Sequence, residues 1–453
     1  MLRLATPVVL IQLGMMSMGV VDTVMVGHLS TVALAAVALG NLYFFVFAVF
    51  GMGTLMVLDP VVAQAVGARD EPAIARGIQR GVLLACLLTV PAAVLLALAK
   101  HLLALAHQPP EILPLAAAFS VRMAPGVLPF YLFVVFRQSL QAMRHTVPIL
   151  IAIVLANLLN ALLNWVLIFG HLGVPAMGVV GSAWATTASR WVLVAGLLSL
   201  SWIHLRAYLR PVRAEIWHLA PLGRMLRLGL PIGSQFVLEF GAFAFVALMM
   251  GWLGTRQMAG HQVAINLASL TFMVPLGVAD AASVLVGHAV GRRDPAGARG
   301  AAWAALTCGA SFMAMTGLLF LTLPGPLARL YSQDSGVITV AVLLIRVAGV
   351  FQVFDGLQAV AGGILRGLGQ TRVAMTGNLL GYWLVGLPVS YYLCFIAGWG
   401  PVGLWWGLVL GLGLVAAFLL TRVRLGLGRQ QQRVMIDPVP PPAALDRSVP
   451  SVP

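Results

Sequence analysis

Three carboxylates lie deep inside long apolar stretches of this 453-residue sequence: Asp22, Glu239 and Asp355. An ionised carboxylate at the centre of a membrane-spanning helix costs about 2.5–3.5 kcal/mol on insertion scales, so an acid retained there needs a reason. A carboxylate in such surroundings can hold a proton, a hard cation or a lipophilic cation. We therefore treat all three as candidate cation-binding residues, and as the expected ligands if the bound ion is Na⁺.

The first half of the chain places further oxygen atoms within reach of its acid. The segment ANLLNALLNWVLIFG carries Asn157, Asn160 and Asn164 at i, i+3 and i+7, which is one face of a helix. Thr186, in the segment GSAWATT, can add a hydroxyl. Together with Asp22 these groups predict an oxygen-lined pocket for a hard cation or a proton. The alternative is a structural knot of interhelical hydrogen bonds, worth about 0.6 kcal/mol per contact.

In the second half, aromatic rings flank the acid. Phe236 and Phe243 stand three residues before and four residues after Glu239, on the same helix face. A carboxylate framed by aromatic rings can hold a lipophilic cation through charge pairing and cation–π attraction. The alternative is that the two phenylalanines simply face lipid.

A second use of the same acids stays open. Glu239 and Asp355 can bind the coupling ion themselves, together with Gln262 and Asn266, which are one helical turn apart. Sequence alone does not separate an ion site from a substrate site here.

Two other acids stand closer to arginine-rich breaks in the apolar pattern. We expect Asp59 and Asp280 to form salt bridges with Arg69 or Arg292, or to extend toward the membrane surface, rather than to bind a ligand. Three arginines inside apolar stretches have no spacing that assigns them partners: Arg122, Arg190 and Arg346.

The elements that must position these residues are membrane-spanning helices. Hydrophobic residues make up 60% of the chain, charged residues only 9%, and the mean hydropathy is +0.98, far from soluble domains. Spanning a bilayer takes about 20 helical residues. Twelve apolar stretches of that length are expected, near 4–27, 34–58, 78–99, 113–136, 147–169, 179–203, 228–252, 258–286, 300–323, 337–361, 373–397 and 401–421.

Arginine distribution predicts the orientation. Arginine-rich breaks alternate with breaks whose only lysine or arginine residues are Lys100, Arg256 and Arg329. By the positive-inside rule the rich breaks are cytoplasmic, which places both termini inside and requires an even number of spans. The net charge of +14 is thus a consequence of topology, because the arginines are dispersed among apolar segments and do not form a nucleic-acid-binding domain.

The chain repeats itself with a shift of about 224 residues. Pro7 aligns with Pro231, and AVGARDEPAIARG at 65–77 aligns with AVGRRDPAGARG at 289–300, with one residue deleted. Two six-helix halves of the same orientation follow. We predict a first lobe over 1–203, a basic cytoplasmic linker over 204–227, a second lobe over 228–425 and a disordered cytoplasmic tail over 426–453.

With these residues in view, the chain resembles the multidrug and toxic compound extrusion (MATE) family, in its NorM-like branch. The resemblance rests on PVVLIQLGMMSMGVVDTVMVGHLSTVALAAVALG, NLLNALLNWVLIFG, GVVGSAWATT, GSQFVLEFGAFAFVALMMGWLG and FQVFDGLQAVAGGILRGLGQTR, in that order along residues 4–425. It implies an all-α membrane protein whose 12 transmembrane helices form two pseudo-symmetric bundles in a V.

By position, the resemblance makes Asp22, Asn160, Asn164 and Thr186 the cation site of the first lobe. Glu239 and Asp355 become the acids of the second. Phe351, one turn before Asp355, departs from the pattern because it offers no oxygen where some relatives have tyrosine.

The function that the resemblance implies is secondary active export. We expect antiport of cationic or zwitterionic drug-like compounds against Na⁺ or H⁺ across the bacterial inner membrane, by a monomer with no other cofactor. The alternative is a lipid-linked oligosaccharide flippase of the same superfamily, which Arg122, Arg190 and Arg346 would suit. An enzyme or an ATP-driven pump is not expected, because the sequence contains no GxSxG, HExxH or GxxxxGK[ST] motif.

Overall fold

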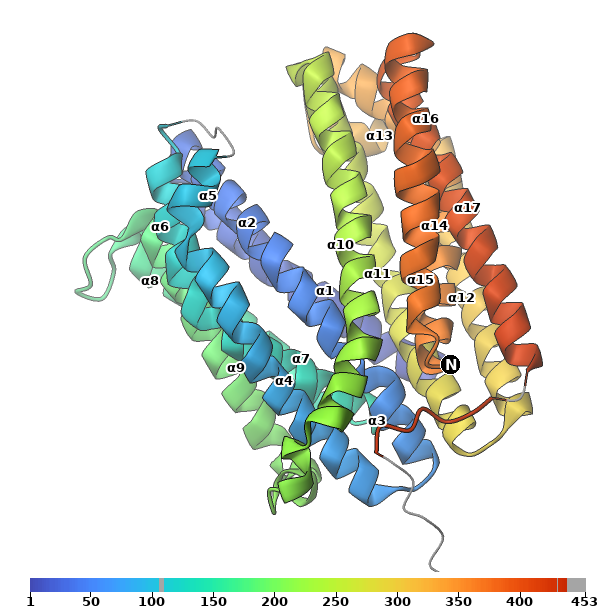
Figure 1. Ribbon diagram of the computed structural model, residues 1–453. Helices are drawn as coiled ribbons and strands as arrows, with labels where there is room; N and C mark the ends of the chain where they lie inside the picture. The colour runs from blue at the N-terminus through green and yellow to red at the C-terminus, as the bar shows by residue number, and fades with distance from the viewer. Residues whose placement is uncertain (106–109, 430, 438–453) are drawn as a thin grey trace, which may run out of the picture.

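The computed structural model describes residues 1–105, 110–429 and 431–437, and over these residues it is built from helices without strands. Within that part, twelve helical segments are long and apolar enough to cross a membrane. They form two bundles that converge at one end and lean apart toward the other, as a V (Figure 1). The predicted twelve-helix, two-lobe architecture is confirmed.

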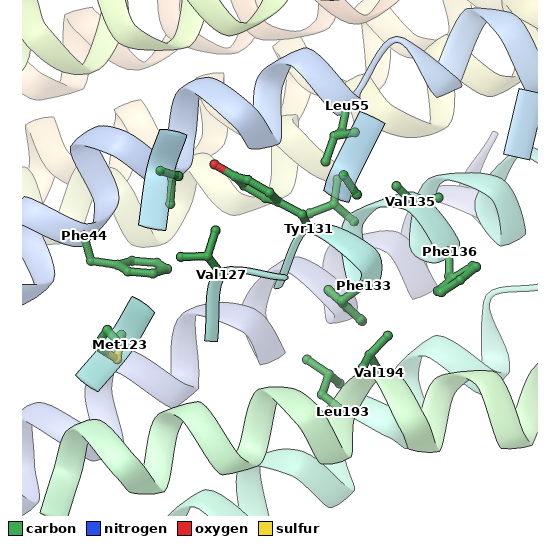
Figure 2. Packing of buried hydrophobic residues seen from close by; sticks show 14 of the residues in the cluster. Phe44, Leu55, Met123, Val127, Tyr131, Phe133, Val135, Phe136, Leu193 and Val194 are labelled. Carbon is green, nitrogen blue, oxygen red and sulfur yellow. The ribbon is translucent and has the colours of Figure 1, made fainter. Parts of the chain in front are cut away.

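The first bundle, the N-lobe, contains the first six spans. Its elements are α1 (Leu2–Gly27), α2 (Thr31–Leu55), α3 (Leu58–Gly67), α4 (Glu71–Ala97), α5 (Ala99–Leu105), α6 (Leu113–Met123), η1 (Ala124–Gly126), α7 (Val127–Ala142), α8 (Val147–Phe169) and α9 (Gly178–Leu209). Figure 2 shows part of its core, where Tyr131 lies among Phe44, Val127 and Leu55. Gly51 of α2 makes this packing possible, since a Cβ there would collide with the Tyr131 ring.

The second bundle, the C-lobe, contains the last six spans. Its elements are α10 (Leu219–Leu253), α11 (Thr255–Gly291), α12 (Pro295–Thr322), α13 (Pro324–Arg329), α14 (Ser335–Gly367), α15 (Thr371–Asn378), η3 (Leu379–Gly386), α16 (Leu387–Tyr391), η4 (Tyr392–Ile396) and α17 (Gly400–Gly428). The connection between the lobes is shorter than the predicted linker 204–227. It consists of residues 210–218, which include η2 (Ala214–Trp217), because α9 and α10 both continue past the apolar stretches.

The repeated segments contain GARD at 67–70 and GRRD at 291–294, and these two tetrapeptides adopt the same local structure. Arg69 and Arg293 both adopt positive φ, 56° and 57°, and each is followed by an aspartate that caps the next helix. Asp70 accepts a hydrogen bond from the Ala73 amide at 3.0 Å, and Asp294 accepts one from the Gly297 amide at 2.8 Å. The repeated motif therefore encodes a tight turn and a helix start, which stabilise α4 and α12.

The lobes meet closely at the converging end, beside these turns. A Cβ on Gly67 of α3 would collide with the His288 backbone of α11, and a Cβ on Gly291 of α11 would collide with the Gln64 carbonyl of α3. The two glycines occupy matched positions of the repeat, 224 residues apart. Each half thus contributes one glycine that lets the two backbones touch.

The segment after α17 differs from the expected disordered tail. The helix continues to Gly428, and residues 431–437, which we call the strap, cross from the C-lobe to the N-lobe (Figure 1). Asp437 pairs with Arg76 and Arg80 at 2.7 Å each, and Ile436 is buried in the N-lobe core. Composition suggested disorder, but this segment is held by the Asp437 ion pairs, an Arg433–Asp70 ion pair at 2.9 Å, backbone hydrogen bonds and the burial of Ile436. The rest of the predicted tail, 438–453, lies outside the described residues.

Candidate functional site

The structure brings together the four N-lobe residues expected at a cation site. Asn164 Nδ2 donates a hydrogen bond to Asp22 Oδ1 at 2.6 Å, and Thr186 Oγ1 donates one to Asp22 Oδ2 at 2.7 Å. Asn164 Nδ2 also donates to Asn160 Oδ1 at 3.2 Å. All four side chains are buried. Helices α1, α8 and α9 therefore meet at one carboxylate.

Asn157 lies on the same helix but outside this cluster. Its Nδ2 donates to the Gly14 carbonyl of α1 and to the Ile153 carbonyl of α8, both at 2.9 Å. It fastens α8 to α1 about two turns from Asp22. The asparagine stripe that sequence spacing suggested is therefore divided between a packing role and the site.

The chemistry of the N-lobe cluster suits a small cation. Both carboxylate oxygens of Asp22 accept hydrogen bonds from neutral groups, and in the described part of the chain Asp22 forms no salt bridge. Asn164 Oδ1 is buried and accepts no hydrogen bond from any described residue. Carboxylate, amide and hydroxyl oxygens are the ligands of hard cations, and an acid in this setting can equally accept a proton.

Arg190 is a neighbour to which sequence reasoning gave no partner. It follows Thr186 by four residues, one turn along α9, and its guanidinium lies over the Phe44 ring with Cζ 4.1 Å from the ring centroid. The Phe130 centroid is 5.3 Å away. The i+4 spacing from Thr186 was the signal that placed this charge on the face of α9 that bears the site.

The C-lobe surrounds Glu239 with amides that the sequence did not single out. Glu239 Oε2 accepts hydrogen bonds from Gln358 Nε2 at 3.3 Å and from Asn378 Nδ2 at 3.2 Å. Gln358 follows Asp355 by three residues on α14, so both face the same side of that helix. Asp355 is only 5% exposed.

Several oxygens near Glu239 are buried and have no donor among the described residues: Gln358 Oε1, Asn378 Oδ1, Gln235 Oε1 and Tyr382 Oη. Tyr382 lies in the π-helical segment η3, directly after Asn378 and α15. Such π-helical turns often occur at functional sites. The C-lobe therefore has its own cluster of acids and free oxygens.

Two of the residues expected beside these acids lie elsewhere. Gln262 Nε2 donates to Asn266 Oδ1 at 3.1 Å, and both side chains are exposed on α11. Within the residues that the structure describes, no hydrogen bond joins either to Glu239 or Asp355. The amide pair is therefore separate from the Glu239 cluster.

The two phenylalanines around Glu239 have different surroundings. The Phe243 ring lies 6.0 Å from both the Phe351 and Tyr382 rings, measured between centroids, so it is part of the C-lobe interior. Phe236 lies at the contact between lobes, since a Cβ on Gly53 of α2 would be 2.9 Å from its ring. Phe351 and Tyr382 therefore both pack against Phe243, and Tyr382 brings a buried phenolic oxygen to this part of the C-lobe.

Asp59 and Asp280 do form ion pairs, but the expected partners were wrong. Arg366 of α14 lies 3.1 Å from Asp280 and 3.8 Å from Asp59, so one buried guanidinium joins acids of both lobes. Gln12 of α1 donates to Asp280 at 3.0 Å. The reason is geometric: Arg69 belongs to the exposed turn described above, whereas Arg366 enters the interface from α14.

Comparisons with known proteins agree with this architecture. The MatE family model matches residues 7–166 and 231–392. The chain is 38% identical to a probable multidrug resistance protein NorM of Mesorhizobium japonicum, over 93% of this chain and 92% of that protein. It is 37% identical to the multidrug resistance protein NorM of Burkholderia vietnamiensis, over 93% of each.

Solved structures show the same fold. The eukaryotic MATE transporter AtDTX14 superposes with a TM-score of 0.87 at 23% identity, over 96% of this chain and 98% of that one. An outward-facing multidrug resistance MATE family transporter of the MOP superfamily superposes with a TM-score of 0.85 at 20% identity, over 94% and 95%. Since a family model covers most of the chain and curated relatives match nearly all of it, this protein is a member of the MatE family.

Proposed function

We propose that this protein is a secondary active multidrug exporter that moves cationic or zwitterionic drug-like compounds out of the cell in exchange for Na⁺ or H⁺. The observation that carries the proposal is the buried Asp22 carboxylate, held by Asn164 and Thr186 and free of any salt bridge in the described residues. Relatives that bear the name multidrug resistance protein NorM support the substrate class.

The N-lobe site can transmit ion binding through α1. An ion or proton bound at Asp22 competes for the carboxylate oxygens that accept hydrogen bonds from Asn164 of α8 and Thr186 of α9, and so changes the bonds that hold α1 to these helices. Ten residues away, about 15 Å along the helix, Gln12 contacts Asp280 of the C-lobe. The first turn of α1 also packs within the C-lobe core through Leu4 and Ala5. Helix α1 therefore connects the ion site to the contact between lobes.

The C-lobe acids provide the second binding site. Glu239 and Asp355, with Gln358, Asn378 and Tyr382, offer two carboxylates and several oxygens without donors. Such a group binds either a cationic substrate or a further coupling ion. In both cases the positive charge of the bound substrate or ion neutralises the acids during part of the cycle. When it leaves, the charge at the contact between α10, α14 and α15 changes.

The orientation supports an outward-facing state. The arginine-rich end is assigned to the cytoplasm by the positive-inside rule, and it is the end where the lobes touch. We propose that alternating access opens these contacts and closes the other end. One elementary charge entering down about 100 mV releases about 2.3 kcal/mol, enough for a gradient of about fiftyfold in an uncharged compound at one ion per cycle.

The proposal is tested by efflux of ethidium or a fluoroquinolone from a pump-deficient bacterium under imposed Na⁺ or H⁺ gradients. Wild type should export the compound, while Asp22→Asn and Glu239→Gln should fail at equal expression. Asp334→Asn is the matched control, because this exposed acid only caps α14 and should leave export unchanged. Failure of wild type under both gradients, with a change in lipid-linked cell-wall precursors on deletion, would favour the flippase.

A further inference from the structure

A groove runs along the outer face of the C-lobe, between α12 and α17. It has a volume of about 770 Å³, and Leu357 of α14 also lines it. The two helices lie side by side there (Figure 1). Neither Asp22 nor Glu239 lines this groove, although Leu357 stands next to Gln358 on α14, and no step of the proposed transport uses it.

The groove has a polar end and an apolar body. Arg299 of α12 and Arg424 of α17 line it at the arginine-rich end, next to Trp303, which is 66% exposed. Deeper residues are apolar, including Leu306, Ala310 and Leu420. From Arg299 to Ala310 the groove extends about 16 Å along the helix, close to one leaflet of a hydrocarbon core of about 30 Å.

The repeat shows what these arginines lack. Arg299 is the counterpart of Arg76, since the matched segments end in ARG at 75–77 and at 298–300. In the N-lobe, Arg76 pairs with Asp437 at 2.7 Å and with Glu215 at 3.4 Å. Among the described residues, Arg299 bonds only to the Pro295 carbonyl of its own helix, at 3.3 Å, and neither it nor Arg424 has a carboxylate partner there.

One helical turn further on, the C-lobe again lacks the ion pair that the N-lobe has. Three residues beyond the ARG segment, the N-lobe has Arg80, which also binds Asp437, whereas the C-lobe has Trp303. An exposed tryptophan one turn from an arginine is typical of the level where headgroups meet acyl chains. The chain has 27 basic and 13 acidic residues, so its own carboxylates are too few to neutralise every arginine.

We infer that the α12–α17 groove binds an anionic phospholipid of the cytoplasmic leaflet, whose phosphate pairs with Arg299 and Arg424 while an acyl chain fills the groove over Leu357. The lipid phosphate takes in the C-lobe the place that Asp437 takes in the N-lobe. Basic pockets between membrane helices on the cytoplasmic side are suited to such headgroups. The inference uses the proposed orientation of the chain and is independent of what it transports.

The test is native mass spectrometry of the full-length purified protein with dioleoyl phosphatidylglycerol and, separately, dioleoyl phosphatidylcholine. Wild type should prefer phosphatidylglycerol. Arg299→Gln and Arg424→Gln should each lower its affinity by about fivefold, and the double variant by about twentyfold to thirtyfold. Arg422→Gln is the matched control, because Arg422 lies at the same end of α17 but over Phe418, outside the groove.

A second measurement needs no variant. Phosphatidylglycerol with a diazirine in one acyl chain should label wild type at the peptides that contain Leu306 and Leu420, and inorganic phosphate should not compete. In the mass spectrometry, the inference would be overturned by equal affinity for both lipids, by unchanged phosphatidylglycerol binding in a folded double variant, or by a loss of affinity in Arg422→Gln equal to that in the groove variants. In the labelling experiment, labels confined to other helices would overturn it. None of these readouts depends on export, so the inference and the transport proposal fail separately.

Discussion

Gln64 and His288 occupy matched positions of the two halves, 224 residues apart, and each bonds to the backbone of the opposite lobe. Gln64 Nε2 of α3 donates to the Gly367 carbonyl at 2.8 Å, and His288 Nε2 of α11 lies 2.7 Å from the Ala142 carbonyl. The acceptors, Gly367 and Ala142, are also matched, with the shift of 225 that applies there. The histidine ring must carry its proton on Nε2 for this bond. The two bonds form a pseudo-symmetric clasp at the arginine-rich end.

Removing the clasp should favour opening of that end. Each bond is worth about 1 kcal/mol, so Gln64→Ala or His288→Ala should raise the population open to the cytoplasm by about fivefold, and the double variant by more. The measurement is a distance distribution between spin labels on the arginine-rich turns of the two lobes. His101→Ala, at an exposed position near the other end, is the control. Unchanged distributions in the double variant would show that the clasp does not hold the lobes together.

The strap should respond to pH in a defined direction. Burial raises the pKa of Asp437, but its hydrogen bonds and ion pairs with Arg80 and Arg76 outweigh burial and hold the pKa below its ordinary value. A depressed folded-state pKa means that the stabilisation is complete above the unfolded pKa of about 3.9 and is lost as pH falls through the folded value. The strap should therefore remain docked at neutral pH.

Hydrogen exchange of residues 431–437 measures this docking. Asp437→Asn should exchange faster than wild type at pH 7, because the charge that attracts both arginines is gone. The exposed Glu111→Gln serves as control. Equal protection in Asp437→Asn and wild type would mean that the other contacts hold the strap without the ion pairs of Asp437. Those contacts are the Arg433–Asp70 ion pair, the hydrogen bonds of Val434 and of the Ile436 carbonyl, and the burial of Ile436.

The twelve spans and the two lobes could be predicted because hydropathy and an internal repeat are properties of the sequence itself. Asp22, Asn160, Asn164 and Thr186 could be predicted as a group because helical spacing and polarity mark them within apolar surroundings. Their hydrogen bonds bring together three helices, as expected of polar groups that must satisfy one another in lipid.

The residues that were missed depend on tertiary contacts. Gln358 and Asn378 come from different helices, 119 and 139 residues from Glu239, and no periodicity connects them. The partner of Asp59 is Arg366, more than 300 residues away, so the nearest arginine in sequence was the wrong choice. The strap was missed because composition describes the average tendency of a segment, whereas Ile436 and Asp437 fit particular sites on the N-lobe.

Neighbouring threonines on α9 offer a sharp test of the N-lobe site. Thr186 Oγ1 donates to Asp22, whereas Thr187 Oγ1 donates to the Arg122 carbonyl at 2.9 Å, and both are 3% exposed. Thr186→Val removes a hydrogen bond to a charged group, worth about 1.5–3 kcal/mol. The ion concentration that gives half-maximal thermal stabilisation should rise by about tenfold or more.

The control is Thr187→Val, which has the same change in shape and burial. It should retain the ion dependence of wild type, even if its melting temperature falls. If both variants lose the ion response equally, the effect is a general one of packing in α9. If neither loses it, the Thr186 hydroxyl is not part of the ion site.

In the C-lobe, the amides that contact Glu239 should matter more than those on α11. Asn378→Ala removes a donor to the carboxylate and a free oxygen, and should raise the half-maximal drug or ion concentration by about tenfold. Asn266→Ala removes an exposed amide whose only side-chain partner in the described residues is Gln262. It should have little effect on ion binding. A large loss confined to Asn266→Ala would return Gln262 and Asn266 to the site.

The exchange of ions for drug is measured most directly in proteoliposomes that contain only the purified protein. An outward drug gradient, in the absence of any ion gradient, should drive Na⁺ or H⁺ in the opposite direction, detected with ²²Na⁺ or a pH-sensitive dye. The account predicts ion movement in wild type and in Asp334→Asn, and none in Asp22→Asn. Drug movement in wild type without movement of either ion would contradict it.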